Sequence, residues 1–427
     1  MRTERTRRRS LRRSVARLAV DVSPLRTSRD FRLLWTGELI SQTGHQITTV
    51  ALFIQIDRIT GSPAAVGAVG LVQLVPMIAV ALGVGPVIDR RDRRGILLGA
   101  QAGLTGASVI LFAGALAGQP PLALLYCAAA LNAALTSIVM PTRAAMTPNL
   151  VPRELLPAAA ALNQVMWNTA QIVGPAVGGI VVGRAGLAWA YGIDVATYVV
   201  AVAFAGLLRP QEPARSSPDS GQERGRDAVL AGVRYLRNKR VLQSTFTVDV
   251  IAMVFGMPRA LFPVLARERF DAGEEAVGYL FAAVAAGALV GALSSGWVGR
   301  VRRPGRAVLV SVAVWGGAIT AFGLADQLVP AMAFLGVAGA ADVVSAVFRS
   351  TIQQTIVPDD LRGRLSSFNI LVVAGGPRLG DFEAGQVAIW FSPAVSVVSG
   401  GLLCVAGVAV LAAAVPRFAS WRIGDPP

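Results

Sequence analysis

Apolar residues recur along the chain in blocks of about twenty, each bounded by turn residues or by charges. A helix that crosses a bilayer needs about 20 apolar residues, so each block predicts one membrane-spanning helix. The pattern predicts an all-α integral membrane protein with twelve transmembrane helices, near residues 33–56, 64–85, 96–117, 121–142, 157–183, 187–208, 242–265, 275–298, 307–326, 329–348, 367–390 and 393–415.

The composition fits a bilayer better than a soluble core. The 427 residues are 54% hydrophobic and 15% charged, with a mean hydropathy of +0.57, whereas soluble domains carry about 25% charged residues. The net charge of +15 would suit nucleic acid. However, the basic residues lie in the N-terminal arm and in the loops between apolar blocks, so we expect a lipid bilayer as partner and no nucleic acid.

The loops with the most Arg predict the orientation of the helices. Most of the 40 Lys and Arg residues fall in the N-terminal arm, in alternate loops and in the C-terminal tail. Cytoplasmic loops carry the excess of positive charge, so both termini are predicted to be cytoplasmic. The preference for Arg over Lys, with abundant Ala and Gly, indicates a bacterial source and hence the bacterial cytoplasmic (inner) membrane.

A polar segment divides the chain into two halves. Residues 1–32 form a basic cytoplasmic arm, and 33–208 form an N-terminal six-helix bundle. Residues 209–241 form a cytoplasmic linker with an interfacial helix, because a Pro- and Ser-rich stretch precedes a basic amphipathic one. Residues 242–418 form a C-terminal six-helix bundle, and 419–427 a cytoplasmic tail.

The two halves also resemble each other in sequence. The pattern that starts at Arg143 and includes Val151-Pro152 recurs from Arg349, where Val357-Pro358 follows at the same spacing, displaced by 206 residues. A repeat of this length is typical of two pseudo-symmetric bundles in a transporter.

The turn at 85–94 is strongly basic and contains an acid. Asp89 beside several arginines can form charge-assisted bonds that join the cytoplasmic ends of two helices, and breaking those bonds would open that side. The alternative is that the arginines only set the topology. The candidate cytoplasmic gate consists of Gly85, Asp89, Arg90, Arg93 and Arg94. A weaker echo follows Gly296, without the acid.

Small residues cluster in the fifth predicted helix. Pro175 removes a backbone donor, and Gly174, Gly178 and Gly179 permit close packing against a neighbouring helix. This segment either seals the outer half of the protein while allowing the helices to rock, or is simply a tightly packed, kinked helix.

Polar side chains inside predicted spans are candidates for substrate and proton contacts, because they are costly in lipid. Glu38, Gln42 and His45 lie on one face of the first helix, and Gln164, Asn168 and Gln171 repeat that spacing in the fifth. The two stripes could face a shared aqueous cavity. Glu38 is a candidate proton carrier with His45 as relay; the alternatives are an interfacial acid and a structural histidine.

Further charges lie deeper in the predicted spans. Arg378 and Asp381 are three residues apart and are expected to pair on one helix face. Together with Asp194, Asp249 and Arg259 they are candidates for the cavity lining and for proton coupling. Phe255 and Phe262 are candidates for aromatic substrate contacts, with core packing as the alternative.

No enzyme or cofactor chemistry is indicated. The chain has one His and two Cys, and it lacks a nucleotide-binding Gly-x-x-x-x-Gly-Lys motif, metal-ligand spacing and a Gly-x-Ser-x-Gly nucleophile motif. We therefore expect no cofactor, no metal and no enzyme activity; an integral-membrane enzyme is the less favoured alternative.

The basic turn resembles the signature loop of the major facilitator superfamily, except that Asp92 stands where Gly is usual. The 174–179 segment is similar to the antiporter motif of drug exporters in that superfamily. Longer phrases, among them 256–263, 277–281 and 291–296, look most like the enterobactin (siderophore) exporter-like branch of bacterial efflux proteins. The resemblance implies a monomer that exports a small organic molecule by alternating access, coupled to protons. The alternative is a multidrug or antibiotic efflux antiporter.

Overall fold

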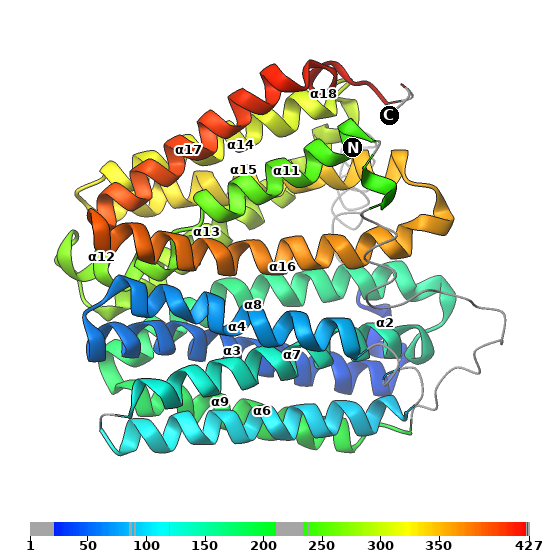
Figure 1. Ribbon diagram of the computed structural model, residues 1–427. Helices are drawn as coiled ribbons and strands as arrows, with labels where there is room; N and C mark the ends of the chain where they lie inside the picture. The colour runs from blue at the N-terminus through cyan, green and yellow to red at the C-terminus, as the bar shows by residue number, and fades with distance from the viewer. Residues whose placement is uncertain are drawn as a thin grey trace, which may run out of the picture.

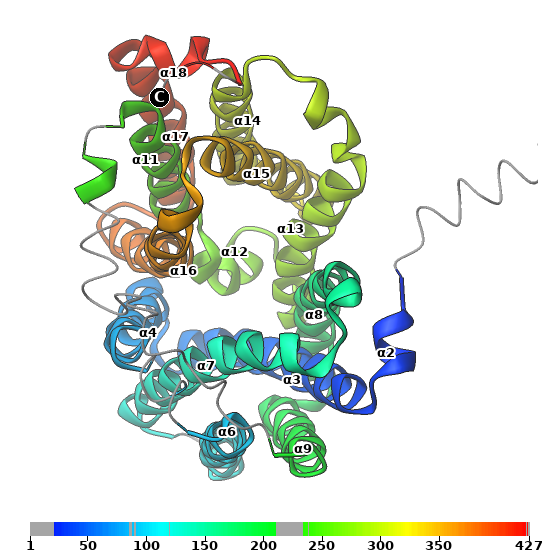
Figure 2. The same cartoon turned by 90° about the vertical axis from the view of Figure 1, so that its right-hand side faces the viewer.

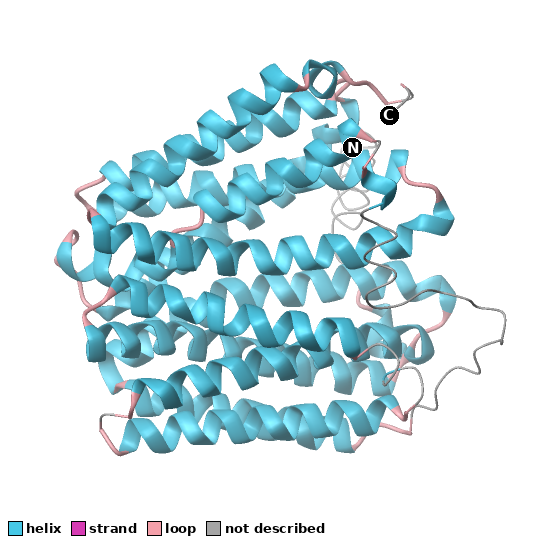
Figure 3. Ribbon diagram, viewed as in Figure 1, coloured by secondary structure: helices cyan, strands magenta, loops and turns pink. Residues whose placement is uncertain are grey.

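The protein is described by a computed structural model that covers residues 21–84, 88, 91–118, 120–210, 234–237, 239–423 and 425. Throughout these ranges the regular elements are helices, which run side by side and form a long bundle (Figures 1 and 3). Both α2, near the start of the described chain, and α18, near its end, lie at the same end of the bundle (Figure 1). We call this the terminal end.

The helices fall into two sets that follow one another in the chain. The N-terminal half contains α2 (Ser23–Thr27), α3 (Arg29–Thr60), α4 (Pro63–Gly83), α6 (Arg93–Leu116), α7 (Leu122–Leu150), η1 (Arg153–Leu155), α8 (Leu156–Ala185) and α9 (Leu187–Gly206). The C-terminal half contains α11 (Arg240–Phe255), η2 (Arg259–Leu261), α12 (Phe262–Glu268), α13 (Glu274–Ser294), η3 (Ser295–Arg300), α14 (Pro304–Leu324), α15 (Leu328–Ile356), α16 (Asp359–Trp390), α17 (Pro393–Ala414) and α18 (Pro416–Ser420).

Ten helical segments in the described chain are long and apolar enough to cross a membrane. The all-α membrane fold predicted from the apolar blocks is therefore confirmed. Two further long helices, α3 and α16, fall outside these ten; they carry many of the candidate polar residues, among them Glu38 and His45 in α3 and Arg378 and Asp381 in α16. The count of twelve spans stays a prediction.

Capping serines, prolines in the first turn and a terminal glycine explain where several helices begin and end. The hydroxyl of Ser28 accepts a hydrogen bond from the backbone N–H of Phe31 at 3.1 Å, which caps the start of α3. Ser62 and Ser392 cap α4 and α17 in the same way, each followed by Pro in the first turn. Gly61 ends α3 at φ 58°, a left-handed conformation that favours glycine.

Two helices extend further than the apolar blocks predicted. The fourth and tenth spans were expected to end near residues 142 and 348, yet α7 continues to Leu150 and α15 to Ile356. Arg143 and Arg349 therefore lie inside helices rather than in loops, and both side chains are largely buried. Hydropathy places the end of a helix too early when a polar side chain has a partner inside the protein.

The seventh span, predicted as one helix over 242–265, is interrupted. α11 ends at Phe255, and Gly256, Met257 and Pro258 separate it from η2 and α12. Pro258 has no backbone N–H to donate, and proline disfavours helical geometry in the preceding residue, so the chain leaves the helix here. Asp249 and Arg259 consequently lie on different helical segments.

The two halves meet along two pairs of helices, α4 with α16 and α8 with α13, on opposite sides of the bundle (Figure 2). Glycines make both contacts close. A Cβ atom on Gly67 of α4 would lie 3.1 Å from the Cα of Gly385 in α16, and one on Gly179 of α8 would lie 2.7 Å from the Cα of Gly278 in α13. Small residues let helix backbones approach in a membrane fold, where dispersion contacts drive association.

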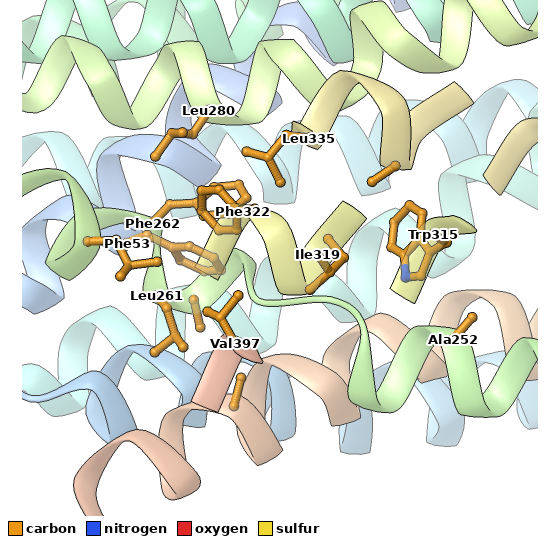
Figure 4. Close-up of a cluster of buried hydrophobic side chains, with 14 of the residues drawn as sticks. Phe53, Ala252, Leu261, Phe262, Leu280, Trp315, Ile319, Phe322, Leu335 and Val397 are labelled. Atoms are coloured by element: carbon orange, nitrogen blue, oxygen red, sulfur yellow. The ribbon is translucent and has the colours of Figure 1, made fainter. Parts of the chain in front are cut away.

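A hydrophobic cluster occupies the bundle where α12, α13 and α14 converge (Figure 4). Phe262 is 1% exposed and makes edge-on ring contacts with Phe281 at 4.9 Å and Phe322 at 5.8 Å between centroids. Phe53 of α3 also contacts the Phe281 ring, so the cluster joins the two halves. Buried aromatic pairs of this geometry add stability beyond their buried area.

The contact between α13 and α15 gives a stability prediction. A Cβ atom on Gly287 would overlap the backbone carbonyl of Gly336, whereas Gly317 on α14 has nothing within 4 Å of its Cβ position. Gly287→Val should destabilise the protein by about 3 kcal/mol through overpacking, and Gly317→Val should have little effect. Thermal unfolding of the two purified variants tests this; equal melting temperatures would contradict the packing.

Candidate functional site

Asp381 forms hydrogen bonds with the start of η2, the helical segment that follows the break in the seventh span. Asp381 of α16 accepts a hydrogen bond from the guanidinium of Arg259 at 2.8 Å and another from the backbone N–H of Ala260 at 3.2 Å. The side chain of Asp381 is 3% exposed and that of Arg259 is 31% exposed. The carboxylate therefore caps η2 and neutralises Arg259 at the same time.

Arg378 and His45 complete a group that we call the central polar cluster: His45, Arg259, Arg378 and Asp381. Arg378 donates to the carbonyl of Ala374 in its own helix, while its buried Nε has no hydrogen-bond partner. The expected helical pair between Arg378 and Asp381 is not among the ion pairs of the described residues, because Asp381 turns to Arg259. The two guanidinium groups and Asp381 still interact electrostatically, and Arg378 acts on His45 of the other half.

A second acid is paired within the N-terminal half. Glu38 of α3 is 2% exposed and lies 2.7 Å from the guanidinium of Arg143 in α7. Gln42, one turn further along α3, donates to the same carboxylate oxygen at 3.2 Å. Glu38 is thus a buried member of an ion pair, and its role as a proton carrier or as an interfacial acid stays a prediction.

The C-terminal half contains an equivalent pair. Asp249 of α11 lies 2.8 Å from Arg349 of α15, with Asp342 at 4.0 Å and Ser345 accepting from the same guanidinium at 3.0 Å. Arg143 and Arg349 are the residues related by the 206-residue repeat. The repeat therefore preserves a contact between the first and fourth long helices of each half.

Asp194 has a different environment. It is fully buried in α9, where the hydroxyls of Thr48 and Ser108 donate to one carboxylate oxygen at 2.8 and 2.7 Å. Its other oxygen has no partner, and the described residues place no cation in an ion pair with it. These bonds tie α9 to α3 and α6 inside the N-terminal half.

The remaining residues predicted to contact substrate differ in how far their side chains are exposed. On α8, Gln164 donates to Asn168 at 3.0 Å in an exposed position, and Gln171 is half-buried. Phe255 is half-buried, whereas Phe262 lies in the hydrophobic cluster and offers no open surface. Core packing, the alternative considered for Phe262, describes what the structure shows.

The 174–179 segment packs against both halves. Cβ atoms on Gly174 and Gly178 would lie 2.9 Å from the carbonyl oxygen of Thr43 and 3.1 Å from the Cα of Ile47, both in α3. Gly179 faces Gly278 of α13 instead. The helix continues through Pro175, which is buried inside α8.

Only part of the basic turn can be described. Gly85, Asp89 and Arg90 lie outside the described residues. Arg93 donates to the carbonyl of Ala145 at 2.9 Å and Arg94 to that of Gly206, so these two arginines join α6 to α7 and α9 within one half. Asp92, the departure from the superfamily pattern, caps α6 by accepting from the backbone N–H groups of Arg94 and Gly95 at 3.2 and 3.3 Å.

Ion pairs that the sequence analysis missed connect the halves at the end opposite the terminal end. We call them the far-end pairs. They join Asp57 to Arg267, Arg58 to Glu274, and Arg184 to Glu275, the last at 3.0 Å. No signal in the sequence links these residues, because the partners are about 90 to 216 positions apart. Within the described chain no group of His, Cys, Asp or Glu is arranged to hold a metal ion.

Two packed halves, many membrane-length helices and charges buried between the helices define a membrane transporter rather than an enzyme. The transmembrane secretion effector model matches residues 19–423, so the chain belongs to that family of the major facilitator superfamily. The resemblance noted in the sequence is thereby confirmed.

Curated relatives agree with this assignment. The chain is 28% identical over 396 residues to the enterobactin exporter EntS of Shigella boydii serotype 18. The aligned region covers 92% of this chain and 93% of that protein. The enterobactin exporter EntS of Escherichia coli O1:K1 matches with the same identity and coverage.

Solved structures share the fold at low sequence identity. A nucleoside transporter, NupG, superposes with a TM-score of 0.71 at 14% identity, covering 92% of this chain and 100% of that one. A bacterial homologue of the iron transporter ferroportin, in an inward-facing state, gives a TM-score of 0.67 at 17% identity, covering 92% and 99%.

The paired acids give a second prediction. Arg349→Gln should destabilise the protein by about 3 kcal/mol, because it leaves the carboxylate of Asp249 buried without its cation. The double variant Asp249→Asn/Arg349→Gln should recover much of that loss. Thermal unfolding measures both, and a double variant no more stable than the single one would show that the pair does not act as a unit.

Proposed function

We propose that this protein is a proton-coupled exporter of an anionic, siderophore-like metabolite across the bacterial cytoplasmic membrane. The observation that carries the proposal is the central polar cluster, in which two arginines of the C-terminal half lie near one carboxylate that, among the described residues, is paired with Arg259 alone. The excess positive charge suits a catecholate or another anionic molecule. The relatives named as enterobactin exporters support the same substrate class.

Alternating access would use the two halves as moving units. Their contacts are close glycine packing along α4–α16 and α8–α13, together with the far-end pairs. Charge in the loops supports a cytoplasmic terminal end, so the far-end pairs would close the outer side. The working unit would be a monomer, since both halves lie in one chain.

Coupling to protons would act through Asp381. Export driven by the inward proton gradient requires that substrate and proton occupy the cluster alternately. The substrate would bind from the cytoplasm while Asp381 is charged and holds Arg259 and the start of η2 in place. A proton taken up by Asp381 on the outer side would free that segment, release the substrate, and leave the carboxylate again at the cytoplasmic side. Glu38, Asp249 and Asp194 are the remaining candidate carriers, with His45 as a relay beside Arg378.

The substrate class can be tested in cells. Deletion of the gene under iron limitation should cause an iron-chelating metabolite to accumulate inside the cells and to fall several-fold in the medium, as measured by comparative mass spectrometry. Expression of the intact protein should reverse both changes. If iron-chelating metabolites do not change and the deletion strain instead becomes sensitive to antibiotics, the substrate is a drug-like molecule and the siderophore assignment is wrong.

The coupling role has its own test. Asp381→Asn cannot exchange a proton at this position, so export of the retained metabolite should lose its dependence on the pH gradient. Asp326→Asn is the matched control, because it removes an acid of the same half that is 86% exposed. Uptake into inside-out vesicles with and without a pH gradient measures both variants. Gradient dependence that survives Asp381→Asn would place the coupling acid elsewhere.

A further inference from the structure

The second copy of the basic turn lies beside an open pocket at the edge of the C-terminal half. Gly85 of the first turn corresponds to Gly296, 211 residues later, and Arg300 stands at the position that corresponds to Asp89. The pocket has a volume of about 600 Å³ and is lined by Trp297, Arg302, Arg303, Arg306, Val310 and Arg422, among others. It is separate from the central polar cluster and has no part in the function proposed above.

Three parts of the chain build this pocket. The indole of Trp297 is held by the Phe348 ring of α15, at 5.8 Å between centroids. α14 starts at Pro304 beside the pocket, without a capping side chain. The C-terminal segment is anchored by Phe418 and Trp421, which are 0% and 2% exposed, and this anchoring presents Arg422 to the pocket.

The charge of the pocket is strongly positive. The described residues contain no ion pair that involves any of its four arginines, Arg302, Arg303, Arg306 and Arg422. One acid, Asp425, bonds to the segment that carries Arg422: its carboxylate accepts from the backbone N–H of Arg422 at 2.9 Å. The uncapped start of α14 adds the positive end of a helix dipole. An anion with several acceptor oxygens fits these donors, and phosphate is the group that arginine binds best.

The surroundings indicate that this anion belongs to a lipid. Val310 is 55% exposed and Trp297 46% exposed, and Leu293, four residues before Trp297, is 79% exposed. Exposed aliphatic side chains suit acyl chains, while tryptophan and arginine at the end of a spanning helix suit the headgroup layer. Residues near the start of α14 line the pocket, and α14 packs against α18, as Figure 2 shows for the two helices.

We propose that this pocket binds the phosphate-bearing headgroup of an anionic phospholipid, with the acyl chains lying along Val310 and Leu293. The sequence of the first turn has Asp89 among its arginines, whereas Arg300 stands at the corresponding position of the second turn. A phospholipid from the surrounding leaflet then provides the negative charge that the second turn lacks at the position of Arg300.

The test uses the purified full-length protein and native mass spectrometry. Phosphatidylglycerol and phosphatidylcholine are added separately, and inorganic phosphate is added both alone and together with phosphatidylglycerol as a competitor. The intact protein should retain phosphatidylglycerol in preference to phosphatidylcholine. Arg302→Gln/Arg303→Gln/Arg306→Gln should weaken phosphatidylglycerol binding by about tenfold or more, since each arginine near the surface contributes to attraction of anionic lipid.

A matched control separates a specific site from general charge attraction. Arg234→Gln/Arg237→Gln/Arg240→Gln removes three arginines, also exposed and at the terminal end, that do not line the pocket. This variant should bind phosphatidylglycerol as the intact protein does. Arg422→Gln, in the exposed C-terminal segment, should weaken binding several-fold without affecting the helices, so the proposal remains testable if the triple pocket variant fails to fold.

Three outcomes would overturn the proposal. The first is equal phosphatidylglycerol binding by the pocket variants and the intact protein. The second is an equal loss in the control triple variant, which would indicate general attraction to the basic surface. The third is that inorganic phosphate competes fully with phosphatidylglycerol at equal concentration, which would make the pocket a site for soluble phosphate.

Discussion

A charge inside a membrane fold must have a partner, and this constraint determines how the helices of the protein are joined. Removing one partner of a buried ion pair costs about 3–5 kcal/mol. Glu38, Asp249 and Asp381 are each matched by an arginine from a different helical segment. Two of these pairs join the first and fourth long helices of a half, and the third fixes the segment after the break. The polar groups that we propose to act in transport therefore also hold the bundle together.

The approximate positions of the helices could be predicted from the sequence, but the ion-pair partners of the buried charges could not. Apolar runs located the helices, and the repeat that starts at Arg143 and Arg349 was visible in one chain. Hydropathy nevertheless placed both arginines in loops, because it cannot register a distant carboxylate. The local rule that pairs Arg378 with Asp381 failed for a related reason: Arg259 offers a bond from another segment, and the break at Pro258 brings it within reach. Tertiary contacts override local spacing where charges are buried.

The two halves are similar but differ in backbone regularity and in where their charges lie. Both halves contain the acid–arginine pair. The first long helix of the N-terminal half, α3, is continuous, whereas the corresponding span of the C-terminal half is interrupted after Phe255. The C-terminal half also contributes three of the four residues of the central polar cluster. The N-terminal half instead buries Asp194 beneath two hydroxyl groups. The irregular backbone and most of the central charges thus lie in the C-terminal half.

The far-end pairs join the halves where water reaches them. The side chains of Arg58 and Arg184 are 45% and 73% exposed, so dissolved ions screen these contacts, with a Debye length of about 8 Å at physiological ionic strength. The deeply buried pairs inside each half are shielded from that screening. Dissolved salt therefore weakens the far-end pairs between the halves more than the buried pairs within each half, so the two sets of ionic contacts respond differently to ionic strength.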